Sequence, residues 1–528
     1  MHPVSPHAVK AMLADGEELA LIDLREELIF SQNHLLWARS VPLSRLELRF
    51  ARLVPRAGTR IVLCDDADGL ARRAADVLSR AGYSNLSYLD GGVAAWAAAG
   101  FEMFSGVNVP SKAFGEFIEH ACATPNIGPE ELHRLIDDGA DIVVLDSRPF
   151  EEYRRVSIPT ATNVPGAELV LRVRDMAPSP DTLVVVNCAG RTRSIIGAQS
   201  LINAGVPNKV VALRNGTMGF TLAGFTCESG KDKRARDKAL SIEGGAWAHE
   251  AARRVAQRHG IERIDEKTLN RWYNDPDRTL YILDVGDPAD YEHMHTPHAI
   301  SAPGGQLVQA TDQYVGTLGA RLVLVEGVRA VMTASWLKQM GWKDVFTFSP
   351  DSLLYDHASG PSIDPILAPD PPRESAIECD ELSKLLARNE ATVIDLSLSP
   401  NYRKEHIPGA WFAIRSRLAQ ALPKIPLRGE IVLTSENGAL AGVAVPEVRA
   451  LTRLPVRYLK GGNAVWWHAK YPLSTEPHMA DDAVDVWLKP YERAGDTKGA
   501  MSEYLSWEVD LVSRIERDGT CNFTTRRD

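Results

Sequence analysis

The sequence predicts an α/β protein of four tandem domains, each a small parallel sheet flanked by helices on both faces. At 528 residues the chain is too long for one hydrophobic core. Four short apolar runs each end in an aspartate, and a second apolar run closes about forty residues after each. The aspartates are Asp23, Asp146, Asp284 and Asp395, and the second runs close at Asp65, Cys188, Glu326 and Ser435. The spacing is 42 residues in three repeats and 40 in the fourth, which indicates an internal repeat.

Each first run holds about five β-branched or aliphatic residues, as a strand buried on both faces does. An amphipathic helical segment precedes it, as in residues 128–146. A helical stretch follows the second run, and a third strand follows that stretch. The third strands lie in residues 86–92, 210–216, 345–350 and 456–462. Strands that alternate with helices favour parallel pairing with right-handed crossovers and compact domains of roughly 100 residues.

The repeats set the expected domain boundaries. The four domains span residues 1–105, 124–230, 260–352 and 374–475, and a helical tail spans 476–528. A Pro-rich linker at 361–374 separates the third and fourth domains. Within the tail, the apolar spacing of residues 502–519 is helical, so we expect this segment to pack on the body of the protein. A helix that binds a partner is the alternative.

Composition excludes several classes of function. The net charge of -10 argues against nucleic acid as a partner. No apolar run approaches the roughly 20 residues of a membrane span, and the N-terminus does not resemble a signal peptide. Six scattered cysteines without a CxxC pair favour the reducing cytoplasm and argue against a disulfide framework or a zinc site. We expect no cofactor, and we expect the HxH of residues 292–298 to be an extended solvated loop, not a metal site.

The second repeat contains a candidate reactive thiol. Cys188 ends an apolar strand, and a helical stretch starts just after it, so the sulfur should lie at the carboxyl end of a parallel strand. The intervening loop can direct backbone N–H groups at the sulfur, and together with the helix dipole they favour an anion such as a thiolate. Two arginines on this loop suit an anionic sulfur donor. The loop residues are Ala189, Gly190, Arg191, Thr192, Arg193 and Ser194.

These motifs resemble the rhodanese superfamily, and the four-repeat layout is similar to multidomain bacterial thiosulfate sulfurtransferases. The motifs are Asp146-Ser-Arg148, residues 157–165 and the Cys188 loop in repeat 2, Asp23-Leu-Arg25 and 91–96 in repeat 1, and 405–411 and 461–466 in repeat 4. Repeat 2 departs from the family pattern at 215–220, where a tryptophan is usual.

The resemblance implies a sulfurtransferase. Cys188 would take a sulfane sulfur from thiosulfate or a related anionic donor, form a persulfide and pass the sulfur to cyanide or a thiol. A protein acceptor is left open. Asp146 and Arg148 would brace the loops instead of reacting.

The other repeats are expected to be inactive. Asp65 cannot carry sulfur, and Cys64, one residue earlier on the strand, points to the other face of the sheet. The third repeat has Glu326 and a shortened loop, and Ser435 of the fourth lacks an evident base. The alternatives are a non-catalytic scaffold or sulfur carrier and, less favoured, a cysteine phosphatase. Such phosphatases have five residues between cysteine and arginine, whereas four separate Cys188 from Arg193.

Overall fold

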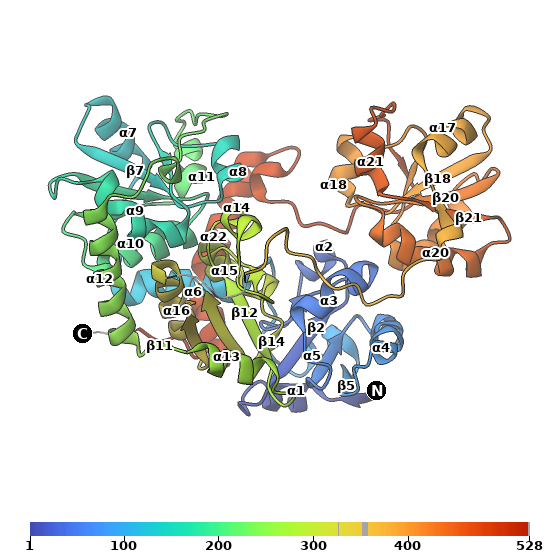
Figure 1. The fold of residues 1–528 in the computed structure, drawn as a ribbon, viewed down its shortest axis with the longest axis horizontal. Helices are drawn as coiled ribbons and strands as arrows, with labels where there is room; N and C mark the ends of the chain where they lie inside the picture. Colours follow the sequence, from blue (N-terminus) through green and yellow to red (C-terminus); the bar gives the residue numbers. More distant parts are fainter. Residues whose placement is uncertain (326, 351–356, 526–528) are drawn as a thin grey trace.

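The computed structural model describes residues 1–325, 327–350 and 357–525, in which each repeat forms its own sheet (Figure 1). Glu326, which the sequence aligns with Cys188, lies outside the described residues. In every sheet the two long apolar strands pair in parallel, and the third strand lies on the far side of the second. The predicted α/β fold of four repeats is confirmed.

The elements follow the same order in each repeat. Repeat 1 has strands β1 (His2–Val4), β2 (Leu19–Asp23), β3 (Arg39–Ser40), β4 (Ile61–Cys64) and β5 (Leu86–Leu89), and helices α1 (Pro6–Met12), α2 (Glu27–Phe30), α3 (Leu46–Leu53), α4 (Leu70–Arg80) and α5 (Gly92–Ala98). Repeat 2 has β6 (Asn126–Ile127), β7 (Ile142–Asp146), β8 (Thr162–Asn163), β9 (Leu183–Asn187) and β10 (Val210–Leu213), and α7 (Pro129–Asp137), α8 (Phe150–Arg155), α9 (Leu169–Met176), α10 (Thr192–Ala204) and α11 (Gly216–Leu222).

Repeat 3 has β11 (Glu262–Arg263), β12 (Leu280–Asp284), β13 (Ile300–Ser301), β14 (Thr317–Leu318), β15 (Arg321–Val325) and β16 (Val345–Phe348), and α13 (Glu266–Tyr273), α14 (Pro288–His293), α15 (Gly304–Gln309) and α16 (Gly327–Gln339). Repeat 4 has β17 (Ala376–Ile377), β18 (Ala391–Asp395), β19 (Trp411–Phe412), β20 (Glu430–Thr434), β21 (Val456–Leu459) and β22 (His478–Met479), and α17 (Cys379–Ala387), α18 (Ser399–Lys404), α19 (Leu418–Ala421), α20 (Ala439–Leu451) and α21 (Gly462–His468). Three further helices link the repeats or follow them: α6 (Val109–Cys122), α12 (Ile242–His259) and α22 (Thr497–Asp518).

Helices cover both faces of the first sheet because its central strand alternates between two cores. Ala20 and Ile22 of β2 belong to one core with α3 and α4. Leu19 and Leu21 belong to another core with α1, α2 and α5. Every side chain of β2 is therefore buried, which explains its unbroken apolar run.

The first sheet is not purely parallel, which corrects the prediction for that repeat. β14 of repeat 3 pairs antiparallel with β2 of repeat 1, Thr317 opposite Ala20. Beside this pair the hydroxyl of Tyr281 donates to the carbonyl of Leu53. Two residues are too short a run to leave an alternation pattern in the sequence. Repeat 3 thus adds one short strand to the sheet of repeat 1, while its other strands form a separate sheet.

The four repeats also pack against one another as two pairs. Repeat 2 packs on repeat 3, where a Cβ at Gly305 would lie 3.0 Å from the nitrogen of Gly166. Repeat 1 packs on repeat 4 through a buried ion pair between Glu47 and Arg415. The fourth sheet extends past residue 475, since β22 pairs with β19. The expected boundary between repeat 4 and the tail is therefore too early.

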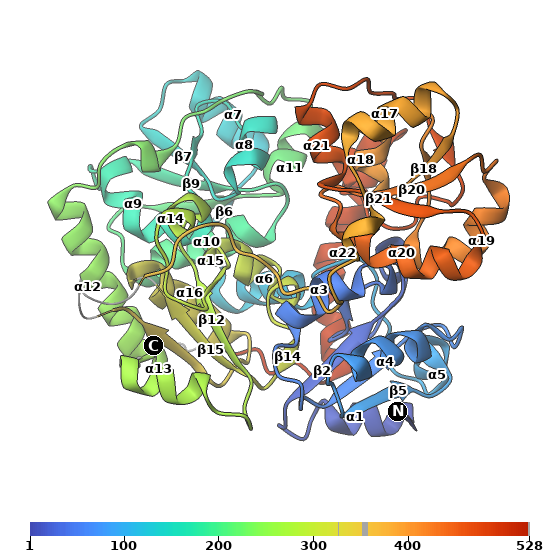
Figure 2. The same cartoon turned by 45° about the vertical axis from the view of Figure 1, so that its right-hand side comes forward.

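Helix α6 lies near the middle of the molecule beside α22 (Figures 1 and 2). Phe114 and Ile118 are fully buried, and a Cβ at Gly115 would come within 2.8 Å of Thr192 on α10. α22 packs on α6 and α11, and its Leu511 is fully buried. Both helices therefore lie against repeat 2.

No helix in the described part of the chain is long and apolar enough to cross a membrane.

The HxH segment is not an extended solvated loop, contrary to the expectation from sequence. His293 ends α14, and His295 is 9% exposed with its ring stacked on Tyr291 at a centroid distance of 3.8 Å. The same stacking recurs in the pairs His34–Phe30 and His406–Tyr402. This histidine therefore packs within the repeat.

Acid should weaken repeat 1 through His34. Burial disfavours the charged imidazole and lowers the pKa of His34 to about 4, whereas the unfolded chain binds the proton near 6.5. Stability from this group is therefore complete above pH 6.5 and should fall by about 3 kcal/mol as the pH drops toward 4. Thermal unfolding at pH 7.5 and 4.5 should show a smaller pH effect in His34→Gln. An equal loss of stability at pH 4.5 in the wild type and in His34→Gln would show that His34 is not the group responsible.

Candidate active site

Cys188 lies at the carboxyl end of β9, and α10 begins four residues later at Thr192. It is 2% exposed, and its sulfur is 3.5 Å from the Ser194 hydroxyl. The N–H of Thr217 donates to the Cys188 carbonyl at 2.9 Å. A Cβ at Gly216, whose φ is +54°, would lie 2.2 Å from that carbonyl oxygen. Only glycine permits this close packing of the α11 turn on the cysteine loop (residues 188–194).

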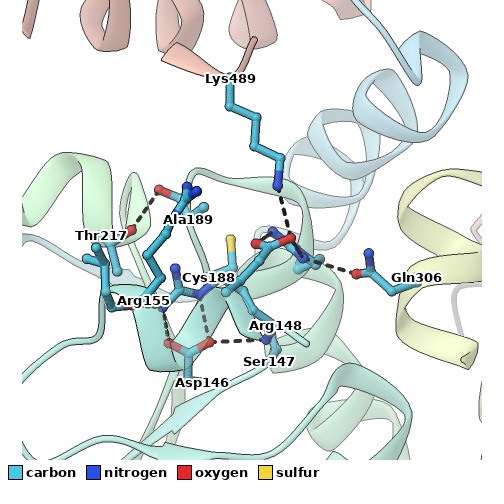
Figure 3. Close-up of polar contacts among 12 residues, drawn as sticks. Asp146, Ser147, Arg148, Arg155, Cys188, Ala189, Thr217, Gln306 and Lys489 are labelled. Atoms are coloured by element: carbon cyan, nitrogen blue, oxygen red, sulfur yellow. Dashed lines mark hydrogen bonds and ion pairs between the residues drawn. The ribbon is translucent and has the colours of Figure 1, made fainter. Parts of the chain in front are cut away.

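Asp146 and Arg148 hold the base of the cysteine loop (Figure 3). The Arg148 guanidinium donates to both carboxylate oxygens of Asp146, at 2.9 and 2.6 Å, and to the carbonyl of Val156 at 2.6 Å. Asn187, which precedes the cysteine, donates to the same carboxylate at 2.9 Å. Asp146 is fully buried, and Arg148 is 2% exposed. The strand that carries Cys188 is thereby tied to the neighbouring strand β7.

The two loop arginines face different parts of the protein. Arg191 turns to α6, where it pairs with Glu116 at 2.7 Å and also with Glu119. Arg193 pairs with Glu152 at 2.8 Å. Burial by itself would lower the pKa of the Arg193 guanidinium, but the charge of the Glu152 carboxylate outweighs burial, so that pKa is raised. The Nε of Arg193 is buried without a partner among the described residues.

Glu152 stays ionised in this cluster. Burial by itself would raise the pKa of its carboxyl, but Arg193, Lys489 and Arg148 lower the pKa well below its usual value. Lys489 comes from the segment that follows repeat 4, and its ammonium is 3.2 Å from Glu152 (Figure 3).

In repeat 1 the loop equivalent to the cysteine loop binds a carboxylate through backbone N–H groups. The Asp65 carboxylate accepts hydrogen bonds from the N–H groups of Ala67 and Ala71, both at 2.9 Å. A negatively charged side chain of repeat 1 thus fills its own loop. By the repeat spacing, the corresponding N–H groups of the cysteine loop belong to Gly190 and Ser194.

The remaining repeats depart from this geometry in different ways. Cys64 ends β4, is fully buried in the core that contains α1, α2 and α5, and has its pKa raised well above 9.0 by burial. In repeat 3, α16 begins at Gly327, two positions after the last residue of β15, whereas in repeat 2 α10 begins five positions after the last residue of β9. In repeat 4 the Ser435 hydroxyl accepts from the N–H of Ala441 at 3.3 Å.

The cysteine lines a pocket of about 350 Å³, here called the Cys188 pocket. Besides residues of repeat 2, its walls come from four other parts of the chain: Glu27 of repeat 1, Asn108 and Lys112 at the start of α6, Gln306, Gln309 and Gln313 of repeat 3, and six residues between Val486 and Glu492 with Tyr504 of the C-terminal segment. Sequence analysis missed all of these residues, because each reaches the cysteine through contacts between repeats that no local pattern reports.

The C-terminal helix contributes a buried cluster next to the loop. Tyr504 donates to Glu508 at 3.0 Å, and the Lys112 ammonium lies 3.1 Å from Glu508, which is fully buried. A Cβ at Gly190 would lie 3.1 Å from Glu508 Oε2. Burial and the Glu508 carboxylate raise the pKa of Tyr504 well above its usual value, so it keeps its proton. No cluster of three or more metal-ligating side chains occurs in the described residues.

Comparison with known proteins identifies the family of the repeats. A family model of the rhodanese-like domain matches residues 5–99, 128–223 and 378–469, more than half of the chain. The crystal structure of a thiosulfate sulfurtransferase from Pseudomonas aeruginosa is 47% identical, covers all of both chains and superposes with a TM-score of 0.96.

Two further relatives match only parts of the chain. A putative sulfur carrier protein of Bacillus subtilis, YrkF, is 24% identical over 134 residues, which are 23% of this chain and 71% of that protein. An uncharacterized protein of Synechocystis is 33% identical over 98 residues, 19% of this chain, so the chain spans about half (54%) of that relative's length. The full-length and repeat-wise matches together show that the chain belongs to the rhodanese family.

Proposed function

We propose that the protein is a sulfurtransferase that moves a sulfane sulfur from thiosulfate or a related anionic donor to cyanide or a thiol. The observation that carries the proposal is the cysteine loop, which places a thiol where the equivalent loop of repeat 1 holds a carboxylate through two N–H groups. The same loop geometry favours a thiolate and then a persulfide anion at Cys188. The full-length similarity to a thiosulfate sulfurtransferase supports it.

In the first step the Cys188 thiolate attacks the outer sulfur of thiosulfate. The sulfur–sulfur bond of the donor breaks, sulfite leaves with the electron pair, and Cys188 becomes a persulfide. Arg193 lines the Cys188 pocket, and we assign its guanidinium to the sulfonate oxygens of the donor.

In the second step the acceptor attacks the outer sulfur of the persulfide. The bond to Cys188 breaks, its electron pair returns to the Cys188 sulfur, and thiocyanate or an acceptor persulfide leaves. Glu116 and Glu119 occupy the Arg191 guanidinium, so we assign Arg191 to holding the loop on α6. Asp146 and Arg148 hold the strand end and do not react.

Mass spectrometry of the full-length protein after incubation with thiosulfate tests this proposal. We expect one additional sulfur atom on the peptide that contains Cys188, removed by cyanide with release of thiocyanate. The peptide with Cys64 is the internal control, because that thiol is buried and its raised pKa keeps it protonated. Sulfur on Cys64, or none on Cys188, would contradict the assignment.

All six cysteines are free thiols in the structure, in keeping with the reducing cytoplasm that we propose as the location of the protein.

A further inference from the structure

One wall of the Cys188 pocket consists of side-chain amides that lie outside repeat 2. Gln306, Gln309 and Gln313 come from α15 and the turn after it in repeat 3, and Asn108 precedes α6. Gln306 and Gln309 are three residues apart on α15 and so lie on one side of that helix, and Gln313 ends the turn that follows it. A repeat without a reactive cysteine thus contributes to the site of its neighbour.

These amides differ from the charged groups of the pocket in having unused hydrogen-bonding capacity. Gln306 accepts from Arg193 at 3.0 Å. For Gln309, Gln313 and Asn108, no side-chain hydrogen bond occurs within the part of the chain that the structure describes. The cations are already engaged in ion pairs, since Arg193 and Lys489 share Glu152 and Lys112 pairs with Glu508.

The free amides indicate what the pocket binds besides sulfur. A primary amide offers both donors and an acceptor, so it suits a ligand that carries N–H and carbonyl groups of its own. An inorganic sulfur oxyanion only accepts. Sites for organic ligands typically have about 300–1,000 Å³, and the Cys188 pocket has about 350 Å³. The pocket thus has room for an organic molecule.

The same pocket restricts the size of that molecule. Cys188 is 2% exposed, and six residues between Val486 and Glu492 line the pocket along with repeat 3. Lys489 and Glu492 of this segment are each paired across to α8, with Glu152 and with Arg155 at 2.9 Å. A thiol on the surface of a folded protein would have to displace these contacts.

We propose that Gln309 and Gln313 of repeat 3 determine the acceptor specificity, and that the acceptor is a small peptide-like thiol with amide groups. The inference rests on the sulfur transfer proposed above. The acceptor thiolate attacks the outer sulfur of the Cys188 persulfide, one sulfur–sulfur bond forms as another breaks, and no oxidant is consumed. The amides of repeat 3 hold the organic part of the acceptor meanwhile.

Acceptor competition in the full-length protein tests the proposal. The probes are the tripeptide thiol glutathione, which has amides, and 2-mercaptoethanol, which has none. In a Gln309→Ala/Gln313→Ala double variant, the ratio of kcat/KM for glutathione to that for 2-mercaptoethanol should fall by about tenfold, from the loss of two neutral hydrogen bonds. Gln257→Ala, on the exposed face of α12, is the matched control and should leave the ratio unchanged.

A charge variant provides a second, independent readout. Gln309→Glu keeps the length of the side chain but adds a negative charge, so it should disfavour the anionic tripeptide thiol and favour cysteamine, whose ammonium is positive. An unchanged ratio in both variants, or an equal loss for both thiols, would overturn the proposal. So would faster transfer to a cysteine-bearing carrier protein than to glutathione. If mass spectrometry found no added sulfur on Cys188, that result would instead contradict the proposed sulfurtransferase function.

Discussion

Replacing Cys188 by alanine is expected to reduce thiosulfate:cyanide sulfurtransferase activity by at least about a thousandfold, because the equivalent positions of repeats 1 and 4 hold no thiol that could take up the sulfur. Cys64 is fully buried, and Asp65 already fills the loop of repeat 1 with its own carboxylate. Ser435 offers a hydroxyl and no thiol. Steady-state release of thiocyanate measures the effect.

Two further variants separate the loss of the nucleophile from a loss of structure. Cys188→Ser keeps the size of the side chain and should be as inactive as Cys188→Ala. Cys227→Ala removes a half-buried thiol in the same repeat and should retain activity. Several per cent of wild-type activity in Cys188→Ala would rule out persulfide transfer at this residue as the route of the reaction.

Removing the carboxylate of Asp146 should cost repeat 2 about 3–5 kcal/mol, the largest stability change that we expect from a single substitution. Asp146→Ala leaves the Arg148 guanidinium, 2% exposed, without its charge partner, and it leaves the Asn187 amide without an acceptor. Hydrogen exchange of the amides in β7 and β9 reports this local loss without requiring the whole chain to unfold in one step.

The fourth repeat provides the matched control. Asp395 is equally buried but accepts from neutral donors, the N–H of Ser397 at 2.9 Å and the amide of Asn463 at 2.8 Å. Asp395→Ala should therefore cost about 1–3 kcal/mol in β18 and β20. Adding Arg148→Met to Asp146→Ala should recover part of the loss, since it removes the unpaired charge. Equal losses at Asp146 and Asp395 would show that the ion pair contributes nothing specific.

The sequence predicts the repeats because the central strands are buried on both faces. In β2 and β7 every position before the terminal aspartate is apolar, so the strand leaves a continuous signal and its aspartate is recognisable. The residues of the cysteine loop are consecutive, so their common location around Cys188 follows from local order alone.

Contacts between repeats left no such signal. α6 is buried on most sides. Its buried side chains include Lys112 and Glu116, which form ion pairs with residues distant in sequence, Glu508 and Arg191. The helix therefore lacks the polar stripe by which surface helices are recognised. β14 is only two residues long, so it shows no alternation of apolar and polar residues by which a strand could be predicted. The glutamines of repeat 3 reach the cysteine only because repeats 2 and 3 pack together.

The docking of α22 beside the cysteine loop has a consequence for biosynthesis. Glu508 contacts Lys112 and lies against Gly190, yet α22 begins at Thr497, 309 residues after Cys188. Domains generally fold as they emerge from the ribosome, at about 5–20 residues per second, so repeat 2 is complete for roughly 15–60 s before α22 has even been made. During translation Cys188 therefore lies in an incomplete pocket, which gains its wall from α22 only after that helix has been made.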